Sequence, residues 1–395
     1  MCPSDASLAA SEEPWFREEH IIFRDQIRRF VNDEIKPQAD KWEETGMVPR
    51  EVLRKMGENG FLGARYAEQY GGANMDTITT AILAEELGKS TFGGFAITVL
   101  VHTDMASPHL NNAGTPEQLK KYMPDIIAGK KITAVGVTEP DAGSDVAGIR
   151  ATAKQDGDHW VLNGTKFFIT NGVHADIYFI AAKTDLTVKG TRGISMFIVE
   201  KGTPGFTVGR SLKKQGWLSS DTAELVFENC RVPKANVLGE INKGFYAVMK
   251  NFQNERIVLG AQAMGEAQAA IQMTIDYVKQ RKAFGATLWD KQAIRQRLAM
   301  AAAKVEAARQ LVYRTAWLDS QGKECVKDVS MVKALCGELV NEVMYVCQQF
   351  HGGFGYIRES AIERMVRDAR VQSIGGGATE VMLEEVAKRM IPSNA

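Results

Sequence analysis

The fold is decided by residues 156–172, DGDHWVLNGTKFFITNG. Two turn-forming pairs, Asp156-Gly157 and Asn163-Gly164, enclose the apolar run 160–162. Because Asp-Gly and Asn-Gly favour two-residue hairpin turns, the stretch predicts consecutive β-hairpins. The period-two pattern extends over residues 131–240, so the middle of the chain is predicted to be a small antiparallel β domain.

Helical periodicity flanks this domain on both sides. Charged and apolar residues alternate at helical spacing across residues 1–130. Within residues 241–395, apolar stripes run from Ile294 to Val312 and from Val329 to Val346. Such stripes bury against neighbouring helices, and their width also suggests packing between subunits. The sequence therefore predicts a mainly α, α+β protein with an N-terminal helical domain (1–130), a β domain (131–240) and a C-terminal helical bundle (241–395).

The composition excludes several classes of protein. The 395 residues carry 48 Lys+Arg and 48 Asp+Glu, so a nucleic-acid partner is not expected. No stretch reaches the roughly 18 apolar residues of a membrane span, and the first residues do not resemble a signal peptide. The five cysteines are dispersed without ligand spacing, which predicts buried thiols in a reducing compartment and no metal site.

Two glycine-rich runs are candidates for ligand binding. Residues 136–148 read GVTEPDAGSDVAG, whose small residues and hydroxyls let backbone N–H groups approach a planar polar ligand. A capped turn is the alternative. Residues 349–356 read QFHGGFGY; the glycines end the preceding helix and also leave bare backbone that a nucleotide can approach.

These two runs, with NGTKFFITNG at 163–172 and RKAFG at 281–285 followed by Gln292, resemble the paired motifs of the acyl-CoA dehydrogenase family. The resemblance covers nearly the whole chain. It implies a helical domain, a β barrel and a four-helix bundle in that order. It also implies FAD as the cofactor and α,β-dehydrogenation of an acyl-CoA thioester, in which a carboxylate removes the α-proton while the β-hydrogen leaves as hydride to flavin N5.

The identity of the base is where this chain departs from one common pattern of the family. Many members place a glutamate on the loop at residues 374–380, but here that loop reads IGGGATE and the matching position is Gly376. The resemblance then implies Glu255, within FQNER, as the catalytic base, and the Gly376 N–H as a donor to the thioester carbonyl. An exposed Glu-Arg pair is the alternative for Glu255. Glu139 and Glu380 are rival carboxylates.

The resemblance assigns the remaining contacts residue by residue. FAD contacts, some from a neighbouring subunit, are expected from Val137, Thr138, Ser144, Phe168, Thr170, Arg281, Phe284, Gln292, Gln349, Gly352, Gly353, Thr379 and Glu380. Acyl-CoA contacts are expected from Ser144, Tyr246, Arg256, Gly375 and Gly376. Ala378 replaces a threonine often found in the family, so one hydroxyl contact is in doubt.

Substrate and context stay open at this point. Residues 221–225 and 349–356 look like the long-chain branch, whereas Gly375 resembles the isovaleryl branch, in which a small residue makes room for a methyl on C3. The expected electron acceptor is an electron-transfer flavoprotein, and the expected assembly is a homotetramer without membrane insertion. An oxygen-using oxidase or flavin monooxygenase and a non-catalytic scaffold are the rival hypotheses. The location is expected to be a bacterial cytoplasm, with a processed mitochondrial matrix chain as the alternative.

Overall fold

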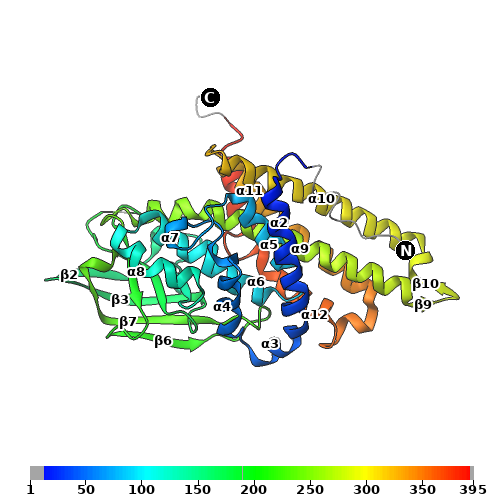
Figure 1. Ribbon diagram of the computed structural model, residues 1–395, viewed down its shortest axis with the longest axis horizontal. Coiled ribbons are helices and arrows are strands. Elements are labelled where there is room, and N and C mark those ends of the chain that lie inside the picture. Colours follow the sequence, from blue (N-terminus) through cyan, green and yellow to red (C-terminus); the bar gives the residue numbers. More distant parts are fainter. Residues whose placement is uncertain (1–12, 189, 392–395) are drawn as a thin grey trace.

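The computed structural model describes residues 13–188 and 190–391. The molecule is elongated, with a β-sheet at one end and the tip of a long helical hairpin at the other (Figure 1). The N-terminal helices occupy the middle of the molecule and extend to the sheet (Figure 1). They are α2 (Glu18–Phe30), α3 (Ala39–Thr45), α4 (Arg50–Glu58), α5 (Thr77–Gly88), α6 (Gly93–Leu100), α7 (Ser107–Ala113) and α8 (Pro116–Ile127). A π-helical turn, η5 (Val101–Ala106), joins α6 to α7.

The sheet comes from the middle of the chain. Its strands are β1 (Thr133–Gly136), β2 (Thr152–Asp156), β3 (His159–Thr170), β4 (Ile177–Lys183), β5 (Ile194–Glu200), β6 (Phe206–Ser211), β7 (Thr222–Pro233) and β8 (Val237–Leu238). They pair in the order β6-β7-β3-β2-β4-β5-β8, and β1 adds to β4 in parallel. The predicted antiparallel β barrel is therefore wrong in two respects, because β1 and β2 both pair with β4 in parallel and the sheet of the described residues does not close.

The edge of the sheet at β8 explains part of this open form. Gln118 of α8 donates from Nε2 to the carbonyls of Ala235 and Val237, at 2.8 Å each. A side chain of the N-terminal helices thus occupies backbone acceptors that a further strand would need. A side chain of α8 therefore covers this edge of the sheet.

One of the two predicted hairpin turns is also wrong. Asp156 pairs with His159 across a two-residue turn, as expected. Asn163 and Gly164, however, lie inside the continuous strand β3, where the pairing with β7 shifts register between Leu162 and Gly164. Gly164 has φ +139°, and a Cβ there would come within 2.7 Å of Ala151 Cα. The local turn signal marks a β-bulge at a close backbone approach, because β7 offers a partner along the whole of β3.

The C-terminal part is helical, as predicted. Its long helices are α9 (Gly244–Gln280), α10 (Gln292–Ser320) and α11 (Val326–His351), followed by the shorter α12 (Ala361–Ala369) and α13 (Thr379–Ala387). A small hairpin of β9 (Lys282–Ala283) and β10 (Ala286–Thr287) joins α9 to α10 at the outer end. Three long helices dominate the expected four-helix bundle in the described part of the chain.

The two apolar stripes are buried within a single chain. Leu298, Val305, Val329 and Val343 are each no more than 2% exposed. The stripes are core, as predicted, but they provide no surface for packing between subunits. The four cysteines that the structure describes are free and buried, whereas Cys2 lies outside the described residues.

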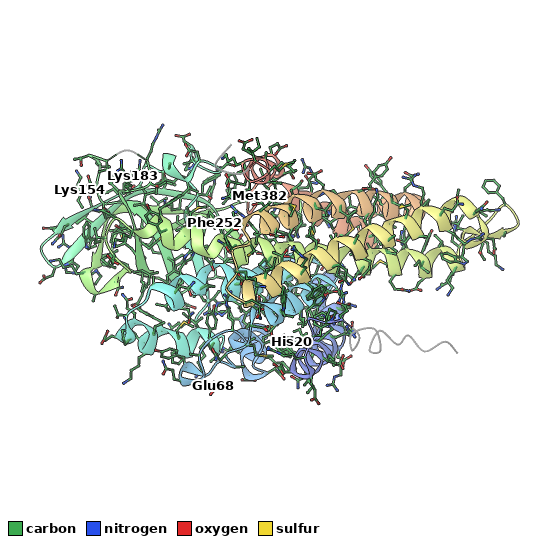
Figure 2. The ribbon with its side chains drawn as sticks, turned by 90° about the horizontal axis from the view of Figure 1, so that it is seen from above. His20, Glu68, Lys154, Lys183, Phe252 and Met382 are labelled. Atoms are coloured by element: carbon green, nitrogen blue, oxygen red, sulfur yellow. The ribbon has the colours of Figure 1, made fainter. Side chains whose placement is uncertain are left out.

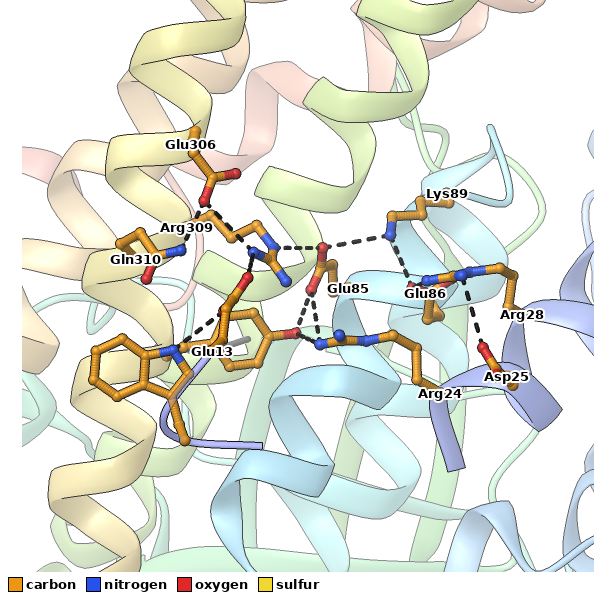
Figure 3. A network of polar contacts seen from close by, with 12 residues as sticks. Glu13, Arg24, Asp25, Arg28, Glu85, Glu86, Lys89, Glu306, Arg309 and Gln310 are labelled. Atoms are coloured by element: carbon orange, nitrogen blue, oxygen red, sulfur yellow. Dashed lines mark hydrogen bonds and ion pairs between the residues drawn. The ribbon is translucent and has the colours of Figure 1, made fainter. Parts of the chain in front are cut away.

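A buried ion-pair network ties the N-terminal helices to the bundle (Figure 3). Glu85 of α5 accepts from Arg309 Nε of α10 at 2.9 Å and also from the Tyr313 hydroxyl. Arg24 of α2 lies 3.9 Å from the same carboxylate. Although burial opposes ionisation, Lys89, Arg309 and Arg24 hold the pKa of Glu85 well below its usual range. Breaking one member would leave an uncompensated buried charge, so the network fixes how α2, α5 and α10 sit together.

Among the described residues, no helix is both long enough and apolar enough to span a bilayer.

Candidate active site

Glu255 lies on α9, where the helix passes from the sheet to the bundle. Figure 2 marks this region by Phe252, one turn earlier on the same helix. The side chain is buried, with 8% of its surface exposed, and burial raises its pKa to about 8. The Asn251 amide, 2.8 Å from Glu255 Oε1, and the positive charge of Arg256 act in the opposite direction. A carboxyl with such a pKa can exchange a proton near neutral pH.

The glycine loop at residues 375–377 packs on the same helix. Gly376 has φ +66° and Gly377 φ +110°, a backbone region that residues with a Cβ rarely adopt. A Cβ at position 376 would meet Leu259 Cδ1 at 2.4 Å. Leu259 is one helical turn after Glu255, so the two side chains project from one side of α9. The structure therefore brings Gly376 to the face of α9 that carries Glu255.

A buried lysine, which no sequence motif singles out, donates hydrogen bonds to carbonyls on either side of this loop. Lys333 of α11 donates from Nζ to the carbonyls of Gln372, at 2.5 Å, and Gly377, at 3.1 Å. Burial lowers its pKa to about 8. Because the two carbonyls bracket Gly375 and Gly376, the ammonium fixes both ends of the glycine loop. A lone lysine in a helical stripe carries no sequence signal for this role.

The rival carboxylate Glu139 is fully engaged by the protein itself. Its Oε1 accepts from the buried Lys166 Nζ at 2.7 Å and from the Ala151 N–H at 3.0 Å. Its Oε2 accepts from the Arg150 N–H at 2.5 Å. These bonds join the 136–148 run to β3, so Glu139 acts as a structural acceptor within the loop.

The neighbouring strand presents an aromatic side chain to the outside. Phe168 is 62% exposed and has φ +60°, at a register shift between Lys166 and Ile169. The Phe167 N–H donates to the Thr138 carbonyl at 2.9 Å, which sets Thr138 beside this bulge. A bulky residue held in the left-handed region with its ring exposed is the kind of strain that clusters at ligand sites. Val137 is buried, Thr170 is partly buried and Ser144 is exposed on the loop.

A second group of predicted residues lies at the outer end of the bundle. A hollow of about 440 Å³ there is lined by Arg281, Gln349, Gly352 and Gly353, among others. Phe284 stands at the tip of the β9–β10 hairpin, 95% exposed and with φ +52°. Gln292 begins α10 and is exposed. A Cβ on Gly352 or Gly353 would meet nothing within 4 Å, so the backbone is open to solvent there, and the φ of +60° at Gly352 also favours glycine.

A third group lies around the start of α13. Thr379 donates to Glu338 Oε1 at 2.7 Å, and Glu380 is exposed. Glu380 lines a hollow of about 570 Å³ together with Arg370, Ser373, Ile374 and Ala378. On α9, Tyr246 is 64% exposed, whereas Arg256 is partly buried over the Phe252 ring. The structure thus gathers Glu255, Arg256 and the glycine loop, but sets the outer group apart at the far end of the molecule (Figure 1).

A second buried carboxyl on α9, which no sequence motif singles out, resembles Glu255. Glu266, farther along α9, accepts from Gln262 Nε2 at 2.7 Å, and burial raises its pKa to about 8. Only the folded structure shows its burial, because the residues that cover it come from α6 and from residues 368–372.

Comparison with known proteins identifies the family. Three family models match in order: the acyl-CoA dehydrogenase N-terminal domain at residues 17–130, the middle domain at 134–230 and the C-terminal domain at 242–391. The chain is 41% identical to the mitochondrial long-chain specific acyl-CoA dehydrogenase of Mus musculus, over 95% of this chain and 87% of that one.

Two further relatives cover almost the whole chain. It is 40% identical to the caffeyl-CoA reductase-Etf complex subunit CarC of Acetobacterium woodii, over 93% of this chain and 97% of that one. The crystal structure of an acyl-CoA dehydrogenase from Geobacillus kaustophilus superposes with a TM-score of 0.91 at 42% identity, covering 95% of this chain and 99% of that one. The chain belongs to the acyl-CoA dehydrogenase family and is an oxidoreductase.

Proposed function

We propose that this protein converts an acyl-CoA thioester to the trans-2-enoyl-CoA, with Glu255 as the base that takes the α-proton. The observation that carries the proposal is the placement of Glu255. It is a buried carboxyl with a pKa of about 8, on the side of α9 against which the Gly376 loop packs. The Gly376 N–H is the proposed donor to the thioester carbonyl, where negative charge develops as the proton leaves.

FAD is the cofactor, and the residues present suit it. When bound, FAD accepts the β-hydrogen as a hydride. The strained, exposed ring of Phe168 offers a flat face for a flavin, and the open glycines of the 440 Å³ hollow offer bare backbone for a dinucleotide. The proposed FAD contacts near the sheet are Val137, Thr138, Ser144, Phe168 and Thr170, with Thr379 and Glu380 on α13.

The proton step depends on water exclusion around Glu255. The base must be ionised to accept the α-proton, and an acyl chain lying over it removes water and raises its pKa further. The carboxylate then binds the proton more readily than an exposed glutamate does. Tyr246, Arg256 and Gly375 are the proposed further contacts of the acyl-CoA.

We propose a homotetramer in which the outer group serves a neighbouring subunit. The outer group lies around the β9–β10 hairpin, at the opposite end of the molecule from β3, the strand that carries Phe168 (Figure 1). Its members are Arg281, Phe284, Gln292, Gln349, Gly352 and Gly353. A single FAD therefore does not contact both the residues around Phe168 and the outer group of the same chain. The exposed Phe284 on its hairpin is suited to reach another copy. We also propose domain boundaries near residues 130 and 240, where the periodicity changes. The boundary near residue 240 separates Phe168 from the outer group.

The acyl group and the electron acceptor are the finer parts of the proposal. Similar identities, 41% and 40%, connect the chain to relatives named for a long-chain acyl-CoA and for caffeyl-CoA, so identity does not select the substrate. We propose a long-chain or C3-branched acyl-CoA, because Gly375 carries no side chain and a Cβ there would meet only Val371, at 3.6 Å or more. An electron-transfer flavoprotein is the proposed acceptor, supported by the Etf in the name of the Acetobacterium relative. Bacterial relatives support a bacterial cytoplasm as the location.

Anaerobic mixing with a panel of straight and 3-methyl acyl-CoAs tests the function. Loss of the flavin absorbance, with an enoyl-CoA as product, is the expected result. Oxygen should then reoxidise the flavin, and so restore its absorbance, more slowly than an electron-transfer flavoprotein does. Fast reoxidation by oxygen would favour an oxidase, and no bleaching with any thioester would refute the proposal.

A further inference from the structure

Asn251 contacts the proposed base and anchors it to another domain. It lies four residues before Glu255 on α9, is 2% exposed, and donates from Nδ2 to Glu255 Oε1 at 2.8 Å. The same nitrogen reaches the Met105 carbonyl at 3.0 Å and the Asp104 carbonyl at 3.3 Å. Both carbonyls belong to η5, the π-helical turn of the N-terminal helices.

The π-helical turn is also held by a second asparagine of α9. Within this turn the Ser107 N–H donates to the His102 carbonyl five residues earlier, and Pro108, which has no N–H, interrupts the pattern one residue later. Asn254 of α9 donates to the Asp104 carbonyl from Nδ2 at 3.0 Å, beside the bond from Asn251. Two asparagine amides from α9 thus hold η5 at one carbonyl. Single π-helical turns of this kind are frequent at functional sites.

The surroundings also fix which way the Asn251 amide points. Its Nδ2 faces three oxygen acceptors, whereas its Oδ1 is buried and has no hydrogen-bond partner among the described residues. Flipping the amide would turn Oδ1 against two carbonyl oxygens and a carboxylate. That repulsion selects the orientation in which an N–H faces Glu255.

We propose that Asn251 is a positioning residue that aims the Glu255 carboxylate and stabilises its ionised form, and that η5 holds this asparagine in place. The inference rests on the proposed function, since it takes Glu255 to be the base. It extends that function by making the Asp104 and Met105 carbonyls of η5, in the N-terminal helices, part of the support of the base.

The charges around Glu255 determine the expected pH effect. Arg256 is the cation beside it on α9, Asp104 of η5 is paired with Arg65, and Lys333 of α11 faces the glycine loop. Burial raises the pKa of Glu255, and the bond from Asn251 lowers it. Removing the donor therefore raises the pKa further, and the rise of flavin reduction with pH moves to higher pH.

Asn251→Leu and Asn254→Leu form a matched pair, because both residues donate to Asp104 but only Asn251 touches Glu255. The flavin-reduction rate is measured by stopped flow from pH 6 to pH 10 with saturating acyl-CoA. We expect Asn251→Leu to move the pH midpoint up by about one unit. Asn254→Leu should leave the midpoint in place even if it lowers stability as much.

An infrared titration gives a readout that does not depend on turnover. The Glu255 carboxyl band is assigned by its loss in Glu255→Gln, and its midpoint should move with that of the rate. If Asn251→Leu does not fold, Asn251→Asp keeps the size of the side chain and sets a like charge beside Glu255, so its shift should be larger.

Three outcomes separate the hypotheses. Equal shifts in the Asn251 and Asn254 variants, or no shift in either Asn251 variant, would overturn the positioning role of Asn251. Wild-type flavin reduction in Glu255→Gln would instead refute the proposed function.

Discussion

Two buried glutamates, one in each half of helix α9, make the same local hydrogen bond but lie in different surroundings. Glu255 accepts from an amide four residues earlier at 2.8 Å, and Glu266 does so at 2.7 Å. Burial raises the pKa of both carboxyls to about 8. Glu266, however, lies under the first turn of α6, where a Cβ on Gly93 would come within 3.3 Å of its Oε1. Glu255 instead adjoins the open glycine loop, so the packing around each carboxyl, and not its pKa, distinguishes the proposed base.

The largest effect is expected when each of these two glutamates is neutralised in turn, which tests whether they differ in function. Glu255→Gln should lower flavin reduction by about 10²–10⁴-fold while FAD stays bound, because the amide has nearly the same shape but cannot take a proton. Glu266→Gln, matched in helix, burial and pKa, should stay within a few-fold of the wild type. Stopped-flow reduction by acyl-CoA measures both rates. A dead Glu266→Gln beside an active Glu255→Gln would reverse the assignment.

A third buried glutamate adds the case of a carboxyl paired with a full charge. Lys166→Met leaves the Glu139 carboxyl buried without its cation and should cost about 3–5 kcal/mol of unfolding free energy. The double variant Lys166→Met, Glu139→Gln should recover much of that loss, whereas the Gln variants at 255 and 266 should cost little. Denaturant unfolding of the four proteins measures the difference. If Lys166→Met is as stable as the wild type, the Glu139–Lys166 ion pair does not hold the loop.

The sequence predicts the order of the three regions better than their details. Periodicity alone locates the helices and the sheet, because those patterns report burial along each element. The Asn163-Gly164 turn was wrong because strand β7, some sixty residues away, supplies pairing that local propensity cannot anticipate.

The candidate site shows the same division. Glu255 follows from resemblance to the family, but its support does not. Asn251 depends on carbonyls of η5 more than a hundred residues earlier, and Lys333 depends on where residues 372–377 fold back. Glu266 shows no pattern in the sequence that separates it from a solvated glutamate. These features arise from contacts between distant segments, which spacing along one helix does not encode.

The pH dependence of stability tests whether both carboxyls of α9 are protonated in the folded protein. Their pKa values rise from 4.5 to about 8 on folding, so the folded state binds protons that the unfolded state releases. Stability should therefore fall as pH rises from about 5 to about 8. The double variant Glu255→Gln, Glu266→Gln should gain on the wild type across that range, and the gap between the two proteins should widen towards its upper end.

Thermal midpoints of the two proteins at several pH values give the measurement. Asp368, whose pKa burial raises to about 7, is present in both proteins and cancels in the difference. A gap that stays constant from pH 5 to pH 9 would mean that neither glutamate binds a proton on folding.

The smallest expected effect concerns the glycines beside each glutamate. Gly265, next to Glu266, packs against α5, and a Cβ there would lie 2.0 Å from the Glu85 carbonyl. A Cβ at Gly375 would meet Val371 Cγ2 at 3.6 Å, an ordinary contact. Gly375→Ala should therefore fold with little loss of stability, whereas Gly265→Ala should separate α5 from α9 and destabilise the protein. If the space at residue 375 admits a methyl on C3, Gly375→Ala should lower kcat/KM for 3-methyl acyl-CoAs by about tenfold or more relative to straight chains, since one methylene in a pocket is worth about 10–200-fold. An equal loss for both substrate classes would show that Gly375 does not border C3 and that the branch preference is set elsewhere along the acyl channel.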